Sequence, residues 1–170
     1  MASFEIKTAE EFAARDPQSR WLARRAARET AEFRSVLQLF VDRGGPIPLQ
    51  EIALGLRDPR ARQLLTALDE EDLIRLQGDH VDVAYPFTAL PTAFVVQLPN
   101  GLERFACCAV DALGIAPMIG QPIEIRSHCH HCREPLELTS TPEGARSERL
   151  GVTLWIGQRA DDRCKIADSL

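Results

Sequence analysis

The segment Cys107-Cys108-Ala109-Val110-Asp111 brings two thiols and a carboxyl group together within five residues. On a helix, Cys108 and Asp111 are three residues apart and Cys107 and Asp111 are four apart, so either thiol could share a face with the carboxylate. The free N–H groups at a helix N-terminus favour a thiolate, which predicts a lowered thiol pKa. A thiolate beside an acid would act as a nucleophile or soft-metal ligand next to a proton donor. The alternative, favoured by spacing alone, is two small core cysteines and a solvated Asp111.

A second pair of thiols, Cys129 and Cys132, has the C-x-x-C spacing of a zinc knuckle, and three histidines lie in the same stretch. Two such thiolates supply half of a tetrahedral zinc site. The sequence has no second C-x-x-C, so Cys164, Cys107 or a nearby histidine would have to complete the site. The alternative is a pair of ordinary turn cysteines.

The composition of the 170 residues is that of a folded globular chain, with 45% hydrophobic and 26% charged residues. No apolar run approaches the ~20 residues of a membrane helix, and the acidic start does not look like a secretory signal, so we expect a cytoplasmic protein with no membrane partner. The five cysteines are then thiols or ligands rather than a disulfide framework. The net charge of -5 argues against nucleic acid as a partner.

The first half of the chain predicts a helical module, residues 1–85, with the layout of a winged helix. The last of its helices, which is the third helix of the winged-helix layout, ends in Asp69-Glu70-Glu71-Asp72 and would repel phosphate, so we expect a covering module rather than a DNA reader. Capping signals and apolar periodicity indicate helices over residues 9–28, 33–43, 49–56 and 59–68, the last capped by Asp58-Pro59, and a hairpin over residues 73–83.

The second half, residues 86–170, predicts an α+β domain whose mixed sheet is built from strand–strand–helix units. Two prolines near residues 85–91 mark the boundary. The second unit looks incomplete, which would leave a sheet edge for a second copy to cover, as in a homodimer. We expect strands over residues 93–98, 102–106, 123–125, 136–138 and 152–156, and a helix over residues 107–113.

Several segments, taken together and in order, resemble the alkylmercury lyases (organomercurial lyases). The resemblance covers about residues 30–156 and includes the helical module. It rests on Tyr85-Pro86-Phe87-Thr88, on the Cys-Ala-x-Asp-x-Leu pattern within residues 104–113, on Ile119-Gly120 and on Ser127-His128-Cys129.

The resemblance implies a bacterial mercury-resistance enzyme that cleaves a carbon–mercury bond by protonolysis, with an organomercurial as substrate and small thiols as partners. It implies no dissociable cofactor, because the mercury enters with the substrate. Matched residue by residue, Cys108 is the first mercury-binding thiol and Asp111 relays the proton to the departing carbon. Cys164 is the candidate second thiol, and Cys107 or Cys129 could substitute for it.

The chain also departs from the family pattern. Cys164 lies closer to Gly151 than the family's second cysteine does, the family's C-terminal helical region is missing, and Cys132 is an addition. These departures keep two other functions open. One is a divergent member with different thiol–carboxylate chemistry on a small molecule. The other is a protein that binds Zn(II) or Cu(I) through Cys108, Cys129, Cys132 and Cys164.

Overall fold

A computed structural model describes residues 30–56, 60–147 and 151–154. The helix predicted over residues 9–28 and the candidate thiol Cys164 lie outside the described residues. The elements run in the order α3 Ala31–Arg43, β1 Ile47–Pro48, α4 Leu49–Leu56, α5 Ala61–Glu70, β2 Ile74–Gln77, β3 His80–Ala84, β4 Phe87–Thr88, β5 Val95–Gln97, β6 Glu103–Ala106, α6 Ala109–Ile119, β7 Ile123–His128, β8 Pro135–Thr141 and β9 Gly144–Arg146.

Helix α3 confirms the helix predicted from the apolar periodicity after residue 33. The Thr30 hydroxyl accepts a hydrogen bond from the Phe33 N–H at 3.3 Å, which satisfies one of the free donors of the first turn. The helix ends at Gly44, whose φ of 74° suits glycine and whose N–H donates to the Phe40 carbonyl oxygen. Phe33, Val36 and Phe40 form its buried face.

Helices α4 and α5 and the β2–β3 hairpin follow in the predicted order, with Gly78-Asp79 at the turn of the hairpin. Asp58-Pro59 lies outside the described residues, and α5 begins at Ala61 with Arg60 in the N-cap position. The acidic end of α5 joins the helix to the hairpin, because the Asp69 carboxylate accepts a hydrogen bond from the Leu76 N–H at 3.0 Å. The comparison of this module with a winged helix stays a prediction.

The described strands form one nine-stranded sheet in which every pairing is antiparallel, so the prediction of a mixed sheet was wrong. The predicted strand–strand–helix unit is present as β5, β6 and α6. Strands β6 and β7, which α6 connects, run in the same direction, but β5 lies between them and pairs antiparallel with both. Strand β5 therefore prevents the direct parallel pairing of β6 with β7 that the connection through α6 alone would predict.

The strand predicted over residues 152–156 is also not formed where the structure describes it, since residues 152–154 lie outside any strand. The last strand of the described residues is β9, which pairs with β8 through a tight turn. In that turn the Thr141 hydroxyl donates to the Gly144 carbonyl oxygen at 3.1 Å, and Gly144 adopts a φ of 149° that favours glycine. Within the described residues, the sheet therefore ends at β9.

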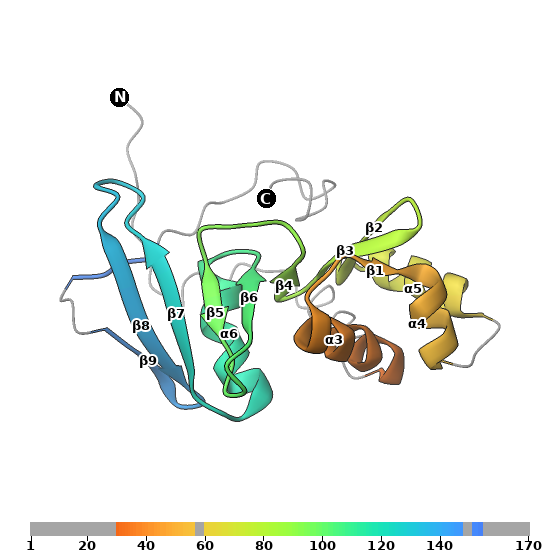
Figure 1. The fold of residues 1–170 in the computed structure, drawn as a ribbon, viewed down its shortest axis with the longest axis horizontal. Coiled ribbons are helices and arrows are strands. Elements are labelled where there is room, and N and C mark those ends of the chain that lie inside the picture. The colour runs from red at the N-terminus through yellow and green to blue at the C-terminus, as the bar shows by residue number, and fades with distance from the viewer. Residues whose placement is uncertain (1–29, 57–59, 148–150, 155–170) are drawn as a thin grey trace, which may run out of the picture.

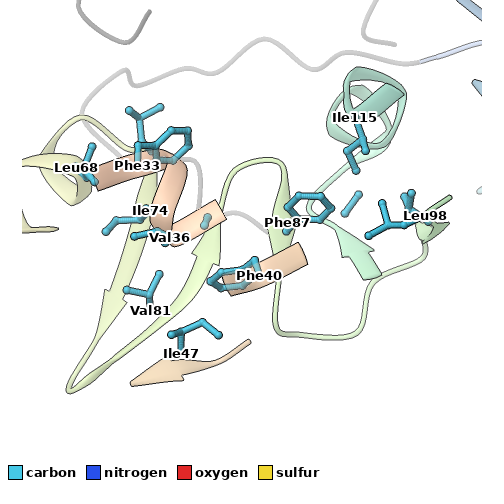
Figure 2. Close-up of a cluster of buried hydrophobic side chains, with 14 of the residues drawn as sticks. Phe33, Val36, Phe40, Ile47, Leu68, Ile74, Val81, Phe87, Leu98 and Ile115 are labelled. Atoms are coloured by element: carbon cyan, nitrogen blue, oxygen red, sulfur yellow. The ribbon is translucent and has the colours of Figure 1, made fainter. Parts of the chain in front are cut away.

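One hydrophobic core runs through the helical part and the sheet part of the described chain (Figure 1). Phe87 of β4 is fully buried, and Figure 2 shows it between Phe40 of α3 and Ile115 of α6. Strand β4 also pairs with β3 on one side and β6 on the other, so the sheet continues across the position of the predicted boundary. The division at residues 85 and 86 stays a prediction. None of the described helices has the length and apolar character needed to cross a membrane.

Candidate active site

The candidate site lies where β6 ends and α6 begins. The Cys107 N–H donates to the Pro86 carbonyl oxygen at 3.0 Å, which ties the end of β6 to the segment before β4. Cys108 is extended, with φ −151° and ψ −179°, and occupies the N-cap position of α6. Its carbonyl oxygen accepts the first helical hydrogen bond, from Ala112 at 2.9 Å. The Cys108 side chain is thereby held beside the first turn of the helix.

Cys108 and Asp111 form a direct contact, because the Cys108 thiol donates to Asp111 Oδ2 at 2.9 Å. Asp111 is the acidic residue of the first turn of α6. Of the two pairings that the spacing allowed, the structure therefore shows the pairing at i and i+3. The contact places a sulfur nucleophile and a proton acceptor side by side on a partly buried surface.

The expectation of a lowered Cys108 pKa was wrong. Partial burial raises the pKa of the Cys108 thiol to about 11, and the hydrogen bond to Asp111 and the carboxylate charge add to the rise. The backbone N–H groups of Asp111 and Val110 lower it, as expected at a helix N-terminus, but their effect is smaller. A thiol that shares a helix start with an acidic side chain therefore holds its proton at neutral pH.

Cys107 has the structural role that the sequence left open for both cysteines. Its side chain is buried with Val83 and Tyr85 in a small cluster of its own. Burial and the nearby Asp111 charge raise the pKa of the Cys107 thiol far above its usual value. Cys107 is therefore a core residue, and only Cys108 of the pair contacts the carboxylate.

Residues 87–170, which include this site, match the family model described as MerB: Alkylmercury lyase. Residues 87–170 therefore belong to the alkylmercury lyase family. An alkylmercury lyase of Staphylococcus epidermidis is 29% identical over 113 residues, which are 65% of this chain and 50% of the relative. Alkylmercury lyases of Bacillus cereus and Clostridium butyricum are each 27% identical over 113 residues. The chain thus spans about half the length of the curated relatives it matches.

A solved structure described as the mercury-bound form of MerB2 has a similar fold. The TM-score is 0.52 at 18% sequence identity, over 81% of this chain and 63% of the other. At that identity the likeness concerns the fold, and it agrees with an α+β chain built on an antiparallel sheet. The Cys108 segment lies inside the residues that the family model matches.

The second thiol pair within this alkylmercury lyase region lies in the turn between β7 and β8. The turn is closed by two backbone hydrogen bonds, from Cys129 N–H to the Glu134 carbonyl oxygen at 2.8 Å and from Arg133 N–H to the Cys129 carbonyl oxygen at 2.9 Å. Arg133 has a φ of 61°, and its Nη1 atom lies 3.0 Å from His128 Nε2. Cys132 is exposed, and its sulfur lies 3.5 Å from Glu134 Oε2.

The zinc site predicted at Cys129 and Cys132 finds no support in the described residues, which contain no group of three or more histidine, cysteine or acidic side chains placed to hold a metal. None of the four cysteines in that part of the chain forms a disulfide. Cys164, the remaining candidate ligand, lies outside the described residues. The role of Cys164 as a second active thiol therefore stays a prediction.

Ser127 of β7 carries a buried hydroxyl for which the sequence predicted no separate role. Its Oγ is buried and has no hydrogen-bond partner within the described part of the chain. Ile123 and Ile125 alternate with exposed residues along β7, so Ser127 lies on the same face as these core residues. Only the tertiary structure distinguishes this hydroxyl from an ordinary surface serine, because burial depends on how distant segments pack together.

Proposed function

We propose that this chain cleaves organomercurials by protonolysis of the carbon–mercury bond, with Cys108 as a mercury-binding thiol and Asp111 as the proton relay. The observation that supports this proposal best is the 2.9 Å contact between the Cys108 sulfur and Asp111 Oδ2. Membership of the alkylmercury lyase family supports the substrate class. Because the chain spans about half of the curated relatives, the activity is a proposal for this chain.

In the first step the Cys108 sulfur binds mercury and gives up its proton. The thiol is protonated at neutral pH because its pKa is about 11, so the proton is still present when the substrate arrives. Mercury(II) is a soft Lewis acid that prefers sulfur ligands, and its binding displaces the proton from the thiol. Asp111 Oδ2 already accepts that hydrogen bond and takes the proton.

In the second step Asp111 delivers the same proton to the carbon bound to mercury. The carbon–mercury bond breaks, its electron pair forms the new carbon–hydrogen bond, and the hydrocarbon leaves. Mercury(II) remains on sulfur, and no electron is exchanged with an outside oxidant or reductant. We propose Cys164 as the second sulfur ligand. Its thiol replaces the small thiolate that arrives with the organomercurial, and that thiolate leaves with the Cys164 proton. A second thiolate adds electron density to mercury and makes the bound carbon easier to protonate.

The proposal is tested by incubating the purified chain with a phenylmercury compound and excess small thiol, and by measuring the release of benzene. We expect release that falls at least about a hundredfold in Cys108→Ser and in Asp111→Asn, because general acid catalysis typically contributes that much. Cys132→Ser is the matched control, since it removes an exposed thiol that lies outside the proposed reaction. Near-normal release in Cys108→Ser would contradict the assignment.

Cys164→Ser tests the second ligand separately. If Cys164 supplies the second thiolate, this variant binds the organomercurial through Cys108 but releases hydrocarbon slowly. If release is unchanged, a small thiol from solution or another cysteine fills that place. Each variant is first checked by circular dichroism and thermal unfolding, so that loss of activity is separated from loss of the fold.

A further inference from the structure

We propose that Cys129 and Cys132 form a second, surface-exposed dithiol site that chelates mercury(II) delivered as a complex with small thiols. The inference deepens the proposed function, because mercury(II) is the ion which that reaction leaves on sulfur. The binding itself is a property of the turn between β7 and β8, and it can be measured without any cleavage.

The turn keeps the two cysteines close together in the chain, with two residues between them. Two backbone hydrogen bonds, which join Cys129 to Arg133 and to Glu134, fix the conformation of the turn and limit how far the two cysteines can separate. Cys132 is exposed and Cys129 partly so, which leaves both sulfurs accessible to a metal complex from solution.

The number of ligands decides which metal such a site suits. Zinc needs four protein ligands in a structural site, and the described residues assemble no group of three or more. Mercury(II) is satisfied by two thiolates, which it binds more strongly than nitrogen or oxygen ligands. The same pair of cysteines that is insufficient for zinc is therefore sufficient for mercury. Rotation of the exposed Cys132 side chain, which no core contact restrains, can open the pair to span the metal.

This dithiol and Cys108 follow strands that end at the same end of the sheet. Arg126 of β7 and Phe105 of β6 both pair with Val95 of β5. Strands β6 and β7, which flank β5, therefore run in the same direction and end on the same side. Cys108 follows Phe105 by three residues, and Cys129 follows Arg126 by three residues. Strands β6 and β7 are separated by β5 alone, which corresponds to about 10 Å at the usual strand spacing. The dithiol is therefore close to the position where the proposed reaction produces mercury(II).

The transfer balances without redox chemistry. Mercury(II) held by two small thiolates exchanges onto the protein in two substitutions. The Cys129 thiol and then the Cys132 thiol each form a mercury–sulfur bond and lose a proton, and each departing small thiolate takes one proton up. The second substitution is intramolecular, so the chelated product is favoured over binding to a single cysteine.

The test uses the full chain carrying Cys108→Ser and Cys164→Ser, which removes the thiols of the proposed reaction. Mercury(II) is added as its complex with a monothiol, in excess monothiol, and the retained metal is measured by native mass spectrometry and by the ultraviolet absorption of the mercury–thiolate bonds. We expect one mercury(II) per chain. Adding Cys132→Ser should weaken retention about a hundredfold, because the intramolecular second ligand is lost. Cys107→Ala is the matched control and should retain the ion.

Retention of mercury in the Cys132→Ser background, or no retention before Cys132 is changed, would overturn the site. Preferential retention of zinc over mercury would overturn it too. The proposed function fails separately, because it is measured as benzene release in a chain with Cys108 intact. Cys132→Ser in that chain should leave benzene release unchanged while it removes the second bound mercury. Cys132 is exposed, so the variant should unfold at the same temperature as the parent chain.

Discussion

Arg104 of β6 donates hydrogen bonds to the Val41 carbonyl oxygen near the end of α3, from Nε at 2.9 Å and from Nη2 at 2.6 Å. Nε also lies 2.8 Å from the Phe40 carbonyl oxygen. The last carbonyl groups of a helix have no partner within the helix and carry partial negative charge, so a guanidinium is a suitable cap. This contact joins α3 to the strand that leads into Cys108, across more than sixty residues of sequence.

Arg104→Ala should lower the free energy of unfolding by about 1–3 kcal/mol, because it leaves these helix carbonyls without their charged donor. Arg104→Lys should recover part of the loss, since an ammonium keeps the charge but cannot donate from two fixed positions. Urea denaturation measures both. Arg62→Ala is the control, because the Arg62–Asp79 ion pair is highly exposed and should contribute less than about 1 kcal/mol. Equal losses in the Arg104 and Arg62 variants would contradict the capping role.

Asp111→Asn should make Cys108 more reactive toward iodoacetamide, although the same variant should slow the proposed cleavage. Removing the carboxylate lowers the Cys108 pKa from about 11, while burial, the largest cause, keeps it above the usual value. A lower pKa means more thiolate at pH 8, so we expect alkylation to accelerate roughly three- to tenfold, followed by mass spectrometry of the Cys108 peptide. Glu124→Gln, at an exposed position of β7, should change nothing. A slower reaction in Asp111→Asn would mean that the carboxylate activates the thiol.

Two glycine-to-alanine changes should have opposite effects on stability. A Cβ at Gly45 would lie 2.7 Å from Phe40 Cε1 and 2.9 Å from the Ala89 Cβ, so Gly45→Ala overpacks the core and should cost about 1–3 kcal/mol. A Cβ at Gly114, inside α6, meets nothing within 4 Å. Gly114→Ala should therefore stabilise the chain by about 0.5–1 kcal/mol through helix propensity. Thermal unfolding of the two variants gives the signs, and a stable Gly45→Ala protein would show that Phe40 can move aside.

Ser127→Ala and Ser140→Ala should differ although both residues lie in strands of the sheet and both hydroxyls are shielded from solvent. The Ser140 hydroxyl donates to the Leu113 carbonyl oxygen of α6 at 3.2 Å, so its removal should cost about 1 kcal/mol. The Ser127 hydroxyl has no partner within the described residues, and its replacement should be neutral or slightly stabilising. Denaturant midpoints of the two variants decide the comparison. A larger loss for Ser127→Ala would mean that its hydroxyl is hydrogen-bonded in solution.

Local patterns were enough to locate most of the described elements. The apolar spacing of α3, its capping Thr30 and its terminal Gly44 all act within a few residues of one another. The β2–β3 turn at Gly78-Asp79 and the strand–strand–helix order of β5, β6 and α6 are equally local. The mixed sheet was wrong, and residues 152–154 of the strand predicted over residues 152–156 lie outside any strand. Which strands become neighbours depends on the whole sheet and not on any one segment.

The sequence by itself determined the chemistry of the site, since residue type and spacing bring a thiol and a carboxylate onto one turn of helix at Cys108 and Asp111. Only the tertiary structure decided how each thiol behaves. Burial against Val83 and Tyr85 makes Cys107 a core residue, and partial burial makes Cys108 hold its proton. Burial is a sum over contacts from distant segments, which is why the direction of the Cys108 pKa shift could not be read from the helix alone. The same reason applies to the placement of Cys108 and Cys129 after strands that end at the same end of the sheet. That placement exists because β5 pairs with both β6 and β7.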